Sequence, residues 1–219
     1  ELRLLAHFSG CKELIEAYRE HKDIHSITAS QVFGVPVEQV SPQMRRSAKA
    51  VNFGIIYGIS SFGLGRDLGI SAKRAKEYID KYFETYSDVK KYMDENVERA
   101  KKEGYITTLF GRRRIINELK SSNYNVRSFG ERAAMNMPLQ GSSADIIKIA
   151  MINVFKKLTE QKLQAKLVLQ VHDELVIDCP EEEAAIVSEI LKTEMENAVT
   201  LKVPLTVEVG IGKNWFVAK

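Results

Sequence analysis

The sequence predicts an α+β fold, with a helical first half and a second half that combines helices with strands. Three observations support this class. Apolar residues recur at helical spacing through most of the first 103 residues. The spacing then changes to the two-residue period of strands in two runs, Lys166–Val171 and Glu174–Asp178. Helical patterns lie on both sides of these runs, so the strands are expected to belong to a sheet packed with helices.

The residues up to about Tyr57 are predicted to be helical, with breaks near Gly10, near His21 and at Gly34–Pro36. Ser41–Pro42 indicates a helix start, because serine accepts hydrogen bonds from the first helical amides and proline fits the first helical position. That helix is expected to reach Gly58. Residues 71–103 are also predicted to be helical, with an apolar stripe that consists of Tyr78, Ile79, Tyr82 and Phe83.

After residue 103, short strands are predicted to alternate with longer helices. Segments 105–108 and 113–116 flank Phe110–Gly111 and are expected to form a hairpin. A long helix is predicted from about Tyr124 to Leu158, with an interruption at Pro138, because proline lacks the amide that a helix interior uses. A helix at about 180–199 and a strand at about Leu205–Val209 close the predicted fold.

The composition limits the class of protein. Of 219 residues, 44% are hydrophobic and 28% charged, which allows one domain or two compact subdomains. No apolar run approaches the roughly 20 residues of a membrane span, so no membrane partner is expected. Cys11 and Cys179 fit no metal or redox spacing, which favours a reducing, cytoplasmic location. The chain begins with Glu1 rather than methionine, and we expect it to be a processed or excised piece of a longer protein.

The net charge of +3 alone does not indicate nucleic-acid binding, but the positive charges are clustered. Such clusters are what a phosphate-binding surface needs, although any one of them alone is more typical of an ordinary solvated helix face. The clusters are Arg45, Arg46 and Lys49; Lys73, Arg74 and Lys76; and Arg112, Arg113 and Arg114.

Four side chains of the helix at 42–58 form a stripe that suits a nucleoside triphosphate. Arg45, Lys49, Phe53 and Tyr57 recur every four residues and therefore share one helix face over about 18 Å. The stripe is cationic at one end and aromatic at the other. Arginine and lysine bind phosphate oxygens, and aromatic rings stack on a base.

The alternative is that the two aromatic residues belong to the core and the two cations to the surface. The apolar face of this helix is better supplied by other residues, namely Val51, Ile55, Ile56 and Ile59. Gly54 and Gly58 each cost about 1 kcal/mol in a helix interior. We expect that close approach of another chain or a ligand explains them. From the residues alone, a nucleotide site and a structural stripe remain about equally supported.

A second candidate is the turn between the two apolar strands, at His172-Asp173-Glu174. Phosphoryl transfer with two divalent cations needs carboxylates that hold the ions roughly 3.5–4 Å apart. Mg²⁺ accepts a sparse set of one or two protein carboxylates. A plain turn is the stronger interpretation from these residues alone, because aspartate is common in turns. A metal phosphohydrolase with a His–Asp pair is a rival class, but His7, His21 and His25 do not form its pattern with the pair.

A third candidate is the polar stripe of Arg132, Asn136 and Gln140, also four residues apart, in an apolar setting near Pro138. Such donors suit the minor groove of DNA, whose acceptors are nearly the same for every base pair. A buried polar network is an equally good explanation from the sequence.

The segment from Arg45 to Gly58 resembles motif B of the family A DNA polymerases, the bacterial DNA polymerase I group. The resemblance implies that Arg45 and Lys49 hold the incoming triphosphate and that Lys49 protonates the departing pyrophosphate. It implies that Phe53 packs on the sugar and base, and that Tyr57 borders the templating pocket. Phenylalanine at position 53 resembles the members that discriminate against dideoxynucleotides.

Other segments are similar to the same family. Gln170–Glu174 resembles motif C, which implies that Asp173 binds metal, that Glu174 assists, and that His172 lies near the primer end. Glu131–Gly141 resembles the duplex-contacting segment, which implies DNA contacts for its polar stripe. Asp23-Ile-His25 is similar to the segment whose histidine touches the triphosphate, and Gly104–Arg114 also follows the family pattern.

The first residues resemble only the end of motif A. Glu1 matches its glutamate, which the family uses as a steric gate against a ribose 2′-hydroxyl. The second metal-binding aspartate would lie upstream of Glu1, outside this chain, as would the thumb and any exonuclease-like domain. We therefore expect that these 219 residues alone do not extend a primer.

The resemblance implies a right-hand polymerase fold. Residues 1–6 would end the palm's motif A region, 7–120 would form the helical fingers, and 121–219 the C-terminal part of an antiparallel-sheet palm. The implied function is that of a DNA-directed DNA polymerase in replication or repair, with primer-template DNA and dNTP as partners and Mg²⁺ in a two-metal site. The alternative is a noncatalytic nucleic-acid- or nucleotide-binding module of the same fold.

Overall fold

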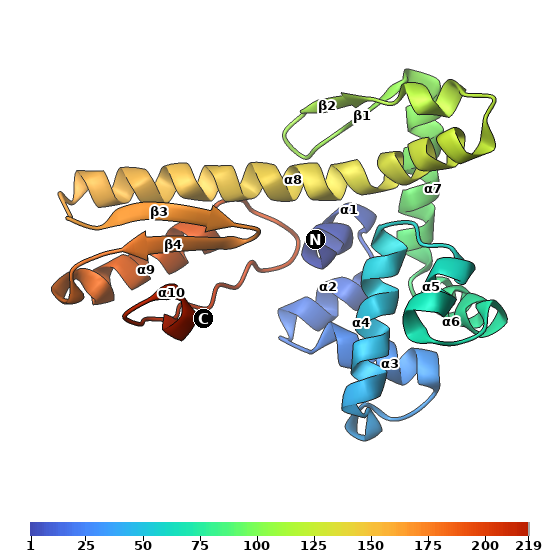
Figure 1. Ribbon diagram of the computed structural model, residues 1–219, viewed down its shortest axis with the longest axis horizontal. Coiled ribbons are helices and arrows are strands. Elements are labelled where there is room, and N and C mark those ends of the chain that lie inside the picture. The colour runs from blue at the N-terminus through green and yellow to red at the C-terminus, as the bar shows by residue number, and fades with distance from the viewer. Residues whose placement is uncertain (219) are drawn as a thin grey trace. The chain divides into compact units, whose positions relative to one another are not determined.

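The structure is a computed structural model that describes residues 1–218, and it divides into two compact units (Figure 1). Unit 1 comprises Glu1–Ser142 and unit 2 comprises Ser143–Lys219. The length of the sequence allowed one domain or two compact subdomains, and the structure has two compact units. In the part of the chain that the structure describes, no helix is long and apolar enough to cross a membrane.

Helices dominate unit 1 before residue 104. The predicted breaks are confirmed, because Gly10, His21 and Gly34 adopt left-handed backbone angles, with φ of 68°, 53° and 69°. The helices are α1 (Leu2–Ser9), α2 (Lys12–Arg19), α3 (Ile24–Phe33), α4 (Pro42–Ile56), α5 (Ser61–Leu68), α6 (Ala72–Thr85) and α7 (Ser87–Glu103), with the short 3₁₀ helix η1 (Val37–Gln39) before α4.

The predicted start of α4 is confirmed. The Oγ atom of Ser41 accepts a hydrogen bond from the amide of Met44 at 3.2 Å, and Pro42 occupies the first helical position. Serine caps α5 and α6 in the same way, since Ser60 accepts from Gly63 and Ser71 accepts from Arg74. These short-range signals fix where each helix begins.

The helical segment 71–103 is divided at Tyr86, which ends α6 and precedes α7. Tyr86 is 1% exposed and leaves helical geometry, with φ of −110° and ψ of 56°. Its ring centroid lies 4.7 Å from that of Tyr82. Burial of this aromatic pair explains a break that local propensity does not predict.

Tyr82 gives a stability prediction, because its ring is fully buried while its hydroxyl has no hydrogen-bond partner among the described residues. Replacing Tyr82 with alanine is expected to lower the free energy of unfolding by about 3–5 kcal/mol. Tyr82→Phe is expected to raise it by about 1 kcal/mol, because it removes an unsatisfied polar group. Urea unfolding followed by circular dichroism measures both, with the exposed Phe62→Ala as control. A destabilised Tyr82→Phe variant would contradict this explanation.

Unit 1 continues into the predicted hairpin and the first part of a long helix. Strands β1 (Tyr105–Thr107) and β2 (Arg113–Ile115) pair antiparallel, with Ile106 opposite Arg114. Ile106 packs with Ile116 on alanines of α7 and α8. The 3₁₀ helix η2 (Asn117–Lys120) leads to helix α8 (Tyr124–Glu160).

The interruption predicted at Pro138 is wrong, because α8 is continuous through it. Proline removes one amide from the helix interior, but burial of the residues around it holds the helix in place. Pro138 and Leu139 are buried. Ser142, also buried, accepts a hydrogen bond on its Oγ from the amide of Leu109 at 2.8 Å. Tertiary packing therefore overrides the local preference.

Unit 2 contains the second predicted hairpin, in which β3 (Lys166–Val171) pairs antiparallel with β4 (Glu174–Asp178). The 3₁₀ helix η3 (Glu181–Glu183) and helix α9 (Ala184–Glu196) follow, where a helix at about 180–199 was predicted. Figure 1 shows the hairpin beside the C-terminal part of α8 and beside α9. The core of unit 2 joins these elements, through Ala150, Val154, Leu158, Ala165, Leu175, Val187 and Ile190.

The strand predicted at Leu205–Val209 is wrong, since this segment pairs with no strand among the described residues. The amide of Val207 donates to Oε1 of Glu196 at 2.9 Å. A side chain of α9 therefore accepts a hydrogen bond that, in a sheet, a carbonyl group of a neighbouring strand would accept. An alternating pattern indicates an extended segment but not whether a partner strand lies beside it. The short helix α10 (Trp215–Ala218) follows.

Candidate functional site

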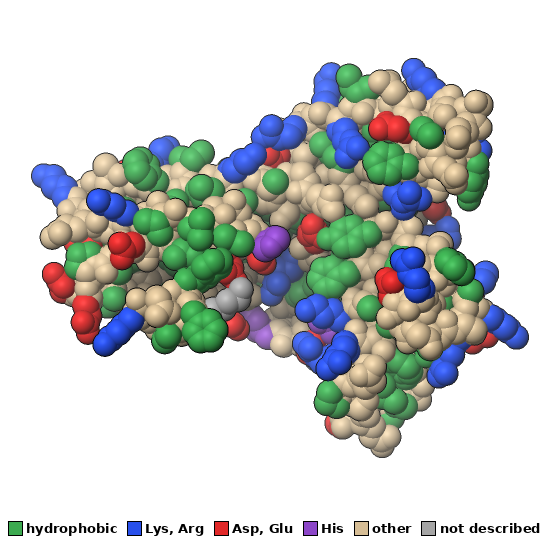
Figure 2. All heavy atoms as spheres, viewed as in Figure 1, with side chains coloured by type: hydrophobic (Ala, Val, Ile, Leu, Met, Phe, Trp, Pro, Cys, Tyr) green, Lys and Arg blue, Asp and Glu red, His purple; other side chains and the backbone are tan. Residues whose placement is uncertain are grey.

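One face of α4 carries the predicted cationic and aromatic stripe. Arg45 and Lys49 are exposed, Phe53 is half-buried, and Tyr57 at the end of the helix is 41% exposed. The opposite face is buried through Ala48, Val51, Ile55 and Ile56. Figure 2 shows basic and apolar side chains following one another over α4 on the face in view. The interpretation that the two aromatic residues are core residues is therefore wrong.

The aromatic end of the stripe borders a cavity of about 570 Å³ in unit 1. Phe53 and Tyr57 line it from α4, and Ser128 and Arg132 line it from α8. Its other lining residues are Ala50, Gly54, Gly58, Ile59, Ser60 and Asp67. A concave site with flat aromatic walls and a few polar groups is typical of ligand binding. Nζ of Lys49 lies 5.9 Å from the centre of the Phe53 ring, so the cationic and aromatic parts are adjacent.

Contacts within the chain explain the two glycines near the end of α4, so a ligand or another chain is not needed. A Cβ at Gly54 would lie 2.7 Å from Cγ2 of Ile59. Gly58 lies just after the helix with φ of 64°, and a Cβ there would lie 2.8 Å from Cγ of Arg132. Both glycines let neighbouring parts of unit 1 approach closely. The expectation that a ligand or another chain explains them is corrected.

Arg45 is held by an acidic residue from α3. Its Nε donates to Oδ2 of Asp23 at 2.5 Å, and Nη2 donates to Oδ1 at 3.3 Å. Partial burial acts to raise the pKa of Asp23, but hydrogen bonds from Arg45, Ser26 and the amide of His25 outweigh it and lower the pKa to about 2. Asp23 also caps α3. The carboxylate is therefore ionised at neutral pH and orients the guanidinium.

His25 lies near the same cations, and a buried asparagine contacts its ring. Nδ2 of Asn52 lies 3.0 Å from Nδ1 of His25. Oδ1 of Asn52 accepts a hydrogen bond from Oγ1 of Thr28 at 3.2 Å. Burial lowers the pKa of His25; Asp23 opposes this effect, while Arg45 and Lys49 add to it. His25 is therefore neutral at physiological pH.

Sequence reasoning did not identify Asn52 or Thr28. Both are buried, with 1% and 0% of their surface exposed. The available signal was a polar residue between Val51 and Ile55, on the buried face of a helix whose polar residues otherwise point outward. A buried amide needs a partner, and the sequence does not reveal that the partner is His25.

Glu1 and Tyr57 are brought together across 56 positions of the chain. The Tyr57 hydroxyl donates to Oε2 of Glu1 at 2.8 Å. Burial raises the pKa of Tyr57, the bond to Glu1 raises it further, and Gln140 acts in the opposite direction. Three residues singled out from separate sequence motifs thus lie together in unit 1.

The polar stripe of α8 is not a joined buried network. Nη1 of Arg132 donates to Oγ of Ser128 at 2.9 Å, and Gln140 is exposed. Oδ1 of Asn136 is buried without a hydrogen-bond partner among the described residues. No hydrogen bond links the three side chains within the described part of the chain. Arg132 lines the same cavity as Phe53 and Tyr57. Gln140 lies beside the Tyr57 hydroxyl and acts to lower its pKa.

In unit 2, the predicted carboxylate turn is confirmed as a two-residue connection between β3 and β4. Val171 pairs with Glu174, and His172 has a φ of 53°, which a non-glycine residue rarely adopts. His172 and Asp173 are exposed. Glu174 is half-buried, and its Oε2 accepts a hydrogen bond from Nε1 of Trp215 at 3.3 Å. The Asp173 carboxylate is therefore exposed to solvent, whereas the Glu174 carboxylate is held by its hydrogen bond from Trp215.

The hairpin context disfavours a His–Asp phosphohydrolase. Such an enzyme needs further histidine and aspartate ligands on helices around the pair. His172 is the only histidine in the sequence of unit 2. The remaining three histidines lie in unit 1, at His7, His21 and His25. Among the described residues, none of them belongs to a group of side chains with the geometry of a metal site.

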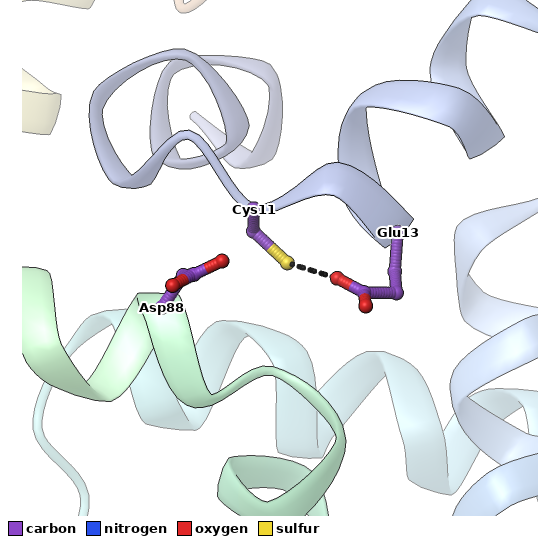
Figure 3. A group of neighbouring side chains, drawn as sticks. All are labelled: Cys11, Glu13 and Asp88. Atoms are coloured by element: carbon purple, nitrogen blue, oxygen red, sulfur yellow. Dashed lines mark hydrogen bonds between the residues drawn. The ribbon is translucent and has the colours of Figure 1, made fainter.

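A separate group in unit 1 has the residue types of a metal site but a different chemistry. Ligand atoms of Cys11, Glu13 and Asp88 lie within 4.8 Å of one another (Figure 3). Burial raises the pKa of the Cys11 thiol to about 12, and its Sγ donates to Oε2 of Glu13 at 3.1 Å. We describe the group as a hydrogen-bonded contact where α2 begins, and we assign no metal to it.

Comparison with known proteins gives consistent matches over the whole chain. The sequence model described as DNA polymerase family A matches residues 1–217. DNA polymerase I of Caldicellulosiruptor bescii is 57% identical over 219 residues, which cover 100% of this chain and 26% of that relative. DNA polymerase I of Bacillus subtilis is 53% identical over 219 residues, which cover 100% of this chain and 25% of that relative.

A solved structure gives the same result for the fold. The POL domain of Pol1 from M. smegmatis, in complex with DNA primer-template and dNTP, is 44% identical with a TM-score of 0.95, over 99% of this chain and 38% of that chain. The predicted α+β polymerase fold is confirmed. This chain spans about a quarter of the length of the curated relatives it matches. Because the family model covers nearly every residue, the chain belongs to DNA polymerase family A.

Proposed function

We propose that this chain supplies the nucleotide-binding face and one metal-binding carboxylate of a DNA-directed DNA polymerase. The reaction is template-directed transfer of a deoxynucleotide to the 3′-hydroxyl of a primer. The observation that carries the proposal is the exposed stripe of α4, cationic at Arg45 and Lys49 and aromatic at Phe53 and Tyr57. The M. smegmatis relative is described with primer-template DNA and dNTP, which are the partners proposed here.

The triphosphate is bound by Arg45, Lys49 and His25. Two fixed positive charges and a neutral ring N–H donor match its anionic oxygens. In the free chain the guanidinium of Arg45 is hydrogen-bonded to the carboxylate of Asp23, so an incoming triphosphate competes with this carboxylate for Arg45. The pair is about half exposed, and such pairs contribute only about 0–1 kcal/mol, so displacement costs little. Lys49 donates a proton to the departing pyrophosphate as the primer oxygen attacks the α-phosphate.

The sugar and base lie against the aromatic end of the stripe. Phe53 provides a flat apolar surface beside Lys49, and Tyr57 borders the template base. Glu1 acts as a steric gate against a ribose 2′-hydroxyl. Its hydrogen bond to Tyr57 fixes the carboxylate beside the aromatic side chain. Discrimination between deoxynucleotides and ribonucleotides then depends on a contact between two separate motifs.

The DNA duplex is contacted by Arg132, Asn136 and Gln140, with His172 near the primer end. Oδ1 of Asn136 is buried without a hydrogen-bond partner among the described residues, and we propose that the amide nitrogen of this side chain donates to an acceptor of the duplex. An enzyme that copies every sequence benefits from contacts to the minor groove, where base pairs present nearly the same acceptors.

The hairpin residues fit a hard divalent cation, and we propose Mg²⁺. Asp173 presents an exposed carboxylate, and oxygen ligands from few side chains are what Mg²⁺ prefers. Glu174 assists less directly, since its carboxylate accepts the Trp215 hydrogen bond. A bound cation supplies charge stabilisation for the attacking and departing oxygens. The second aspartate of the two-metal site lies outside this chain.

The subdomain assignment is part of the same proposal. We place residues 1–6 at the end of the motif A region, 7–120 in the fingers and 121–219 in the palm. Because the chain spans about a quarter of the length of its relatives, we propose that the thumb, an exonuclease-like domain and the second metal-binding aspartate belong to further parts of a longer enzyme. The 219 residues alone then bind a nucleotide but do not extend a primer.

Nucleotide binding by the chain itself tests the face of α4. Isothermal titration with a deoxynucleoside triphosphate should show saturable binding that Lys49→Ala weakens by about ten-fold, the loss expected for one charged hydrogen bond. Lys73→Ala is the matched control, because Lys73 is another exposed lysine of unit 1 that lies outside the stripe, on α6. Equal losses in the two variants, or no binding at all, would contradict the proposed face.

A further inference from the structure

Asn52 contacts the candidate triphosphate ligand His25 from the buried side. The asparagine lies on α4, and the histidine lies in the first turn of α3. Nδ2 of Asn52 lies 3.0 Å from Nδ1 of His25. An amide nitrogen is only a donor, so Nδ1 must be the unprotonated acceptor of this bond. In the neutral ring the proton is then on Nε2, the nitrogen on the other side of the ring.

Thr28 determines which way the Asn52 amide points. The single hydroxyl proton of Thr28 is shared between two acceptors, the carbonyl oxygen of Ile24 at 2.9 Å and Oδ1 of Asn52 at 3.2 Å. With Oδ1 held by Thr28, Nδ2 is directed toward His25. Thr28 and Asn52 are both buried, so water does not compete for these bonds.

We infer that Asn52 is a positioning residue, which holds His25 in the Nε2-protonated form so that a neutral histidine presents an N–H donor to phosphate. Without this contact a neutral imidazole can present either nitrogen, and an unprotonated Nε2 would repel a phosphate oxygen. The charged groups that act on His25 are Asp23, Arg45 and Lys49, and none of them selects a ring nitrogen by a side-chain hydrogen bond to the ring. Asn52 makes that selection.

This inference deepens the proposed function and rests on it for the identity of the ligand, a nucleoside triphosphate. The form of the ring, however, can be measured without any ligand. Long-range ¹H–¹⁵N correlation spectra separate protonated from unprotonated ring nitrogens. At about pH 8, where imidazoles are neutral, the His25 signals should show protonated Nε2 and unprotonated Nδ1. The signals are assigned by comparison with His25→Phe.

Asn52→Asp is the informative variant, because it keeps the shape of the side chain and replaces the donor with an acceptor. We expect the proton of the His25 ring to move to Nδ1 and the affinity for dATP to fall by about ten-fold. Thr28→Val, which removes the hydroxyl that orients the amide, should produce a mixture of the two ring forms. Asn96→Asp is the matched control: Asn96 is equally buried in unit 1, on α7, and should leave the His25 spectrum unchanged.

The double variant separates positioning from a structural role. If Asn52 acts through His25, then Asn52→Asp should cause little further loss of dATP affinity in a His25→Phe background. If the fold-losses of dATP affinity in the two single variants instead multiply in the double variant, the inference is overturned. An unprotonated Nε2 in the unaltered chain would overturn it too, and that measurement needs no variant to fold. If the unaltered chain binds no dATP while His25 shows the expected form, the positioning stands and the proposed nucleotide face fails.

Discussion

Replacing Lys49 with alanine is expected to lower the rate of nucleotide incorporation by about 10²- to 10⁴-fold, the usual contribution of a positioned general acid. The affinity for primer-template DNA should change little. The measurement uses an exchange chimera, in which this chain replaces the matching segment of Bacillus subtilis DNA polymerase I. The alignment of the two spans 219 residues at 53% identity, so the exchange keeps the length of the relative nearly unchanged.

The physical reason is the place of Lys49 on α4. Its ammonium group is exposed beside the Phe53 ring, one turn after Arg45, where the polyphosphate of a nucleotide would lie. Lys73→Ala, an exposed lysine of α6, should leave the rate nearly unchanged. If Lys49→Ala weakened duplex binding as much as turnover, the residue would serve DNA binding. A chimera without turnover in either form would favour a noncatalytic binding module.

Replacing Asp173 with asparagine is expected to lower incorporation by the exchange chimera on the order of 10³-fold or more. Asparagine keeps the size of the side chain but removes the negative charge that a divalent cation needs. The turn should fold as before, because asparagine is as well accepted in turns as aspartate. Single-turnover kinetics over a range of Mg²⁺ concentrations measures the effect, and raising Mg²⁺ should recover part of the rate.

Asp178→Asn is the matched control for this variant. Asp178 is exposed at the far end of the same hairpin, opposite Lys166, and is not proposed to bind metal. It should retain the full rate with an unchanged dependence on Mg²⁺. If Asp173→Asn behaved like Asp178→Asn, the turn would be only a connection between strands.

The sequence predicted the elements whose signals are local. The caps of α4 and the breaks at Gly10 and Gly34 depend on residues within one helical turn, and both were confirmed. The errors occurred where distant contacts decide. Pro138 remains within a helix because its neighbours are buried, and residues 205–209 contain no strand because no second strand lies beside them among the described residues. The break at Tyr86 likewise depends on aromatic packing.

For the candidate site, periodicity located the stripe of α4 but not the residues that hold it. Spacing assigns side chains to faces of one helix, and the apolar face predicted from Val51, Ile55 and Ile56 is buried. The sequence left open whether Phe53 and Tyr57 belong to the core. Spacing does not report contacts between helices. Arg45 with Asp23 and Asn52 with His25 both join α3 to α4 across more than 20 positions. Only the folded chain shows that the cation and the imidazole are oriented from the neighbouring helix.

Incorporation of single nucleotides by the unaltered exchange chimera tests the polymerase assignment most directly. Primers are annealed to templates that differ only in the next base, and each of the four deoxynucleotides is supplied in turn. Circular dichroism first establishes that the chimera folds. We predict metal-dependent addition of the nucleotide complementary to each template base, with a large loss on Lys49→Ala. A folded chimera that binds the duplex but adds no nucleotide, or adds one regardless of the template base, would contradict it.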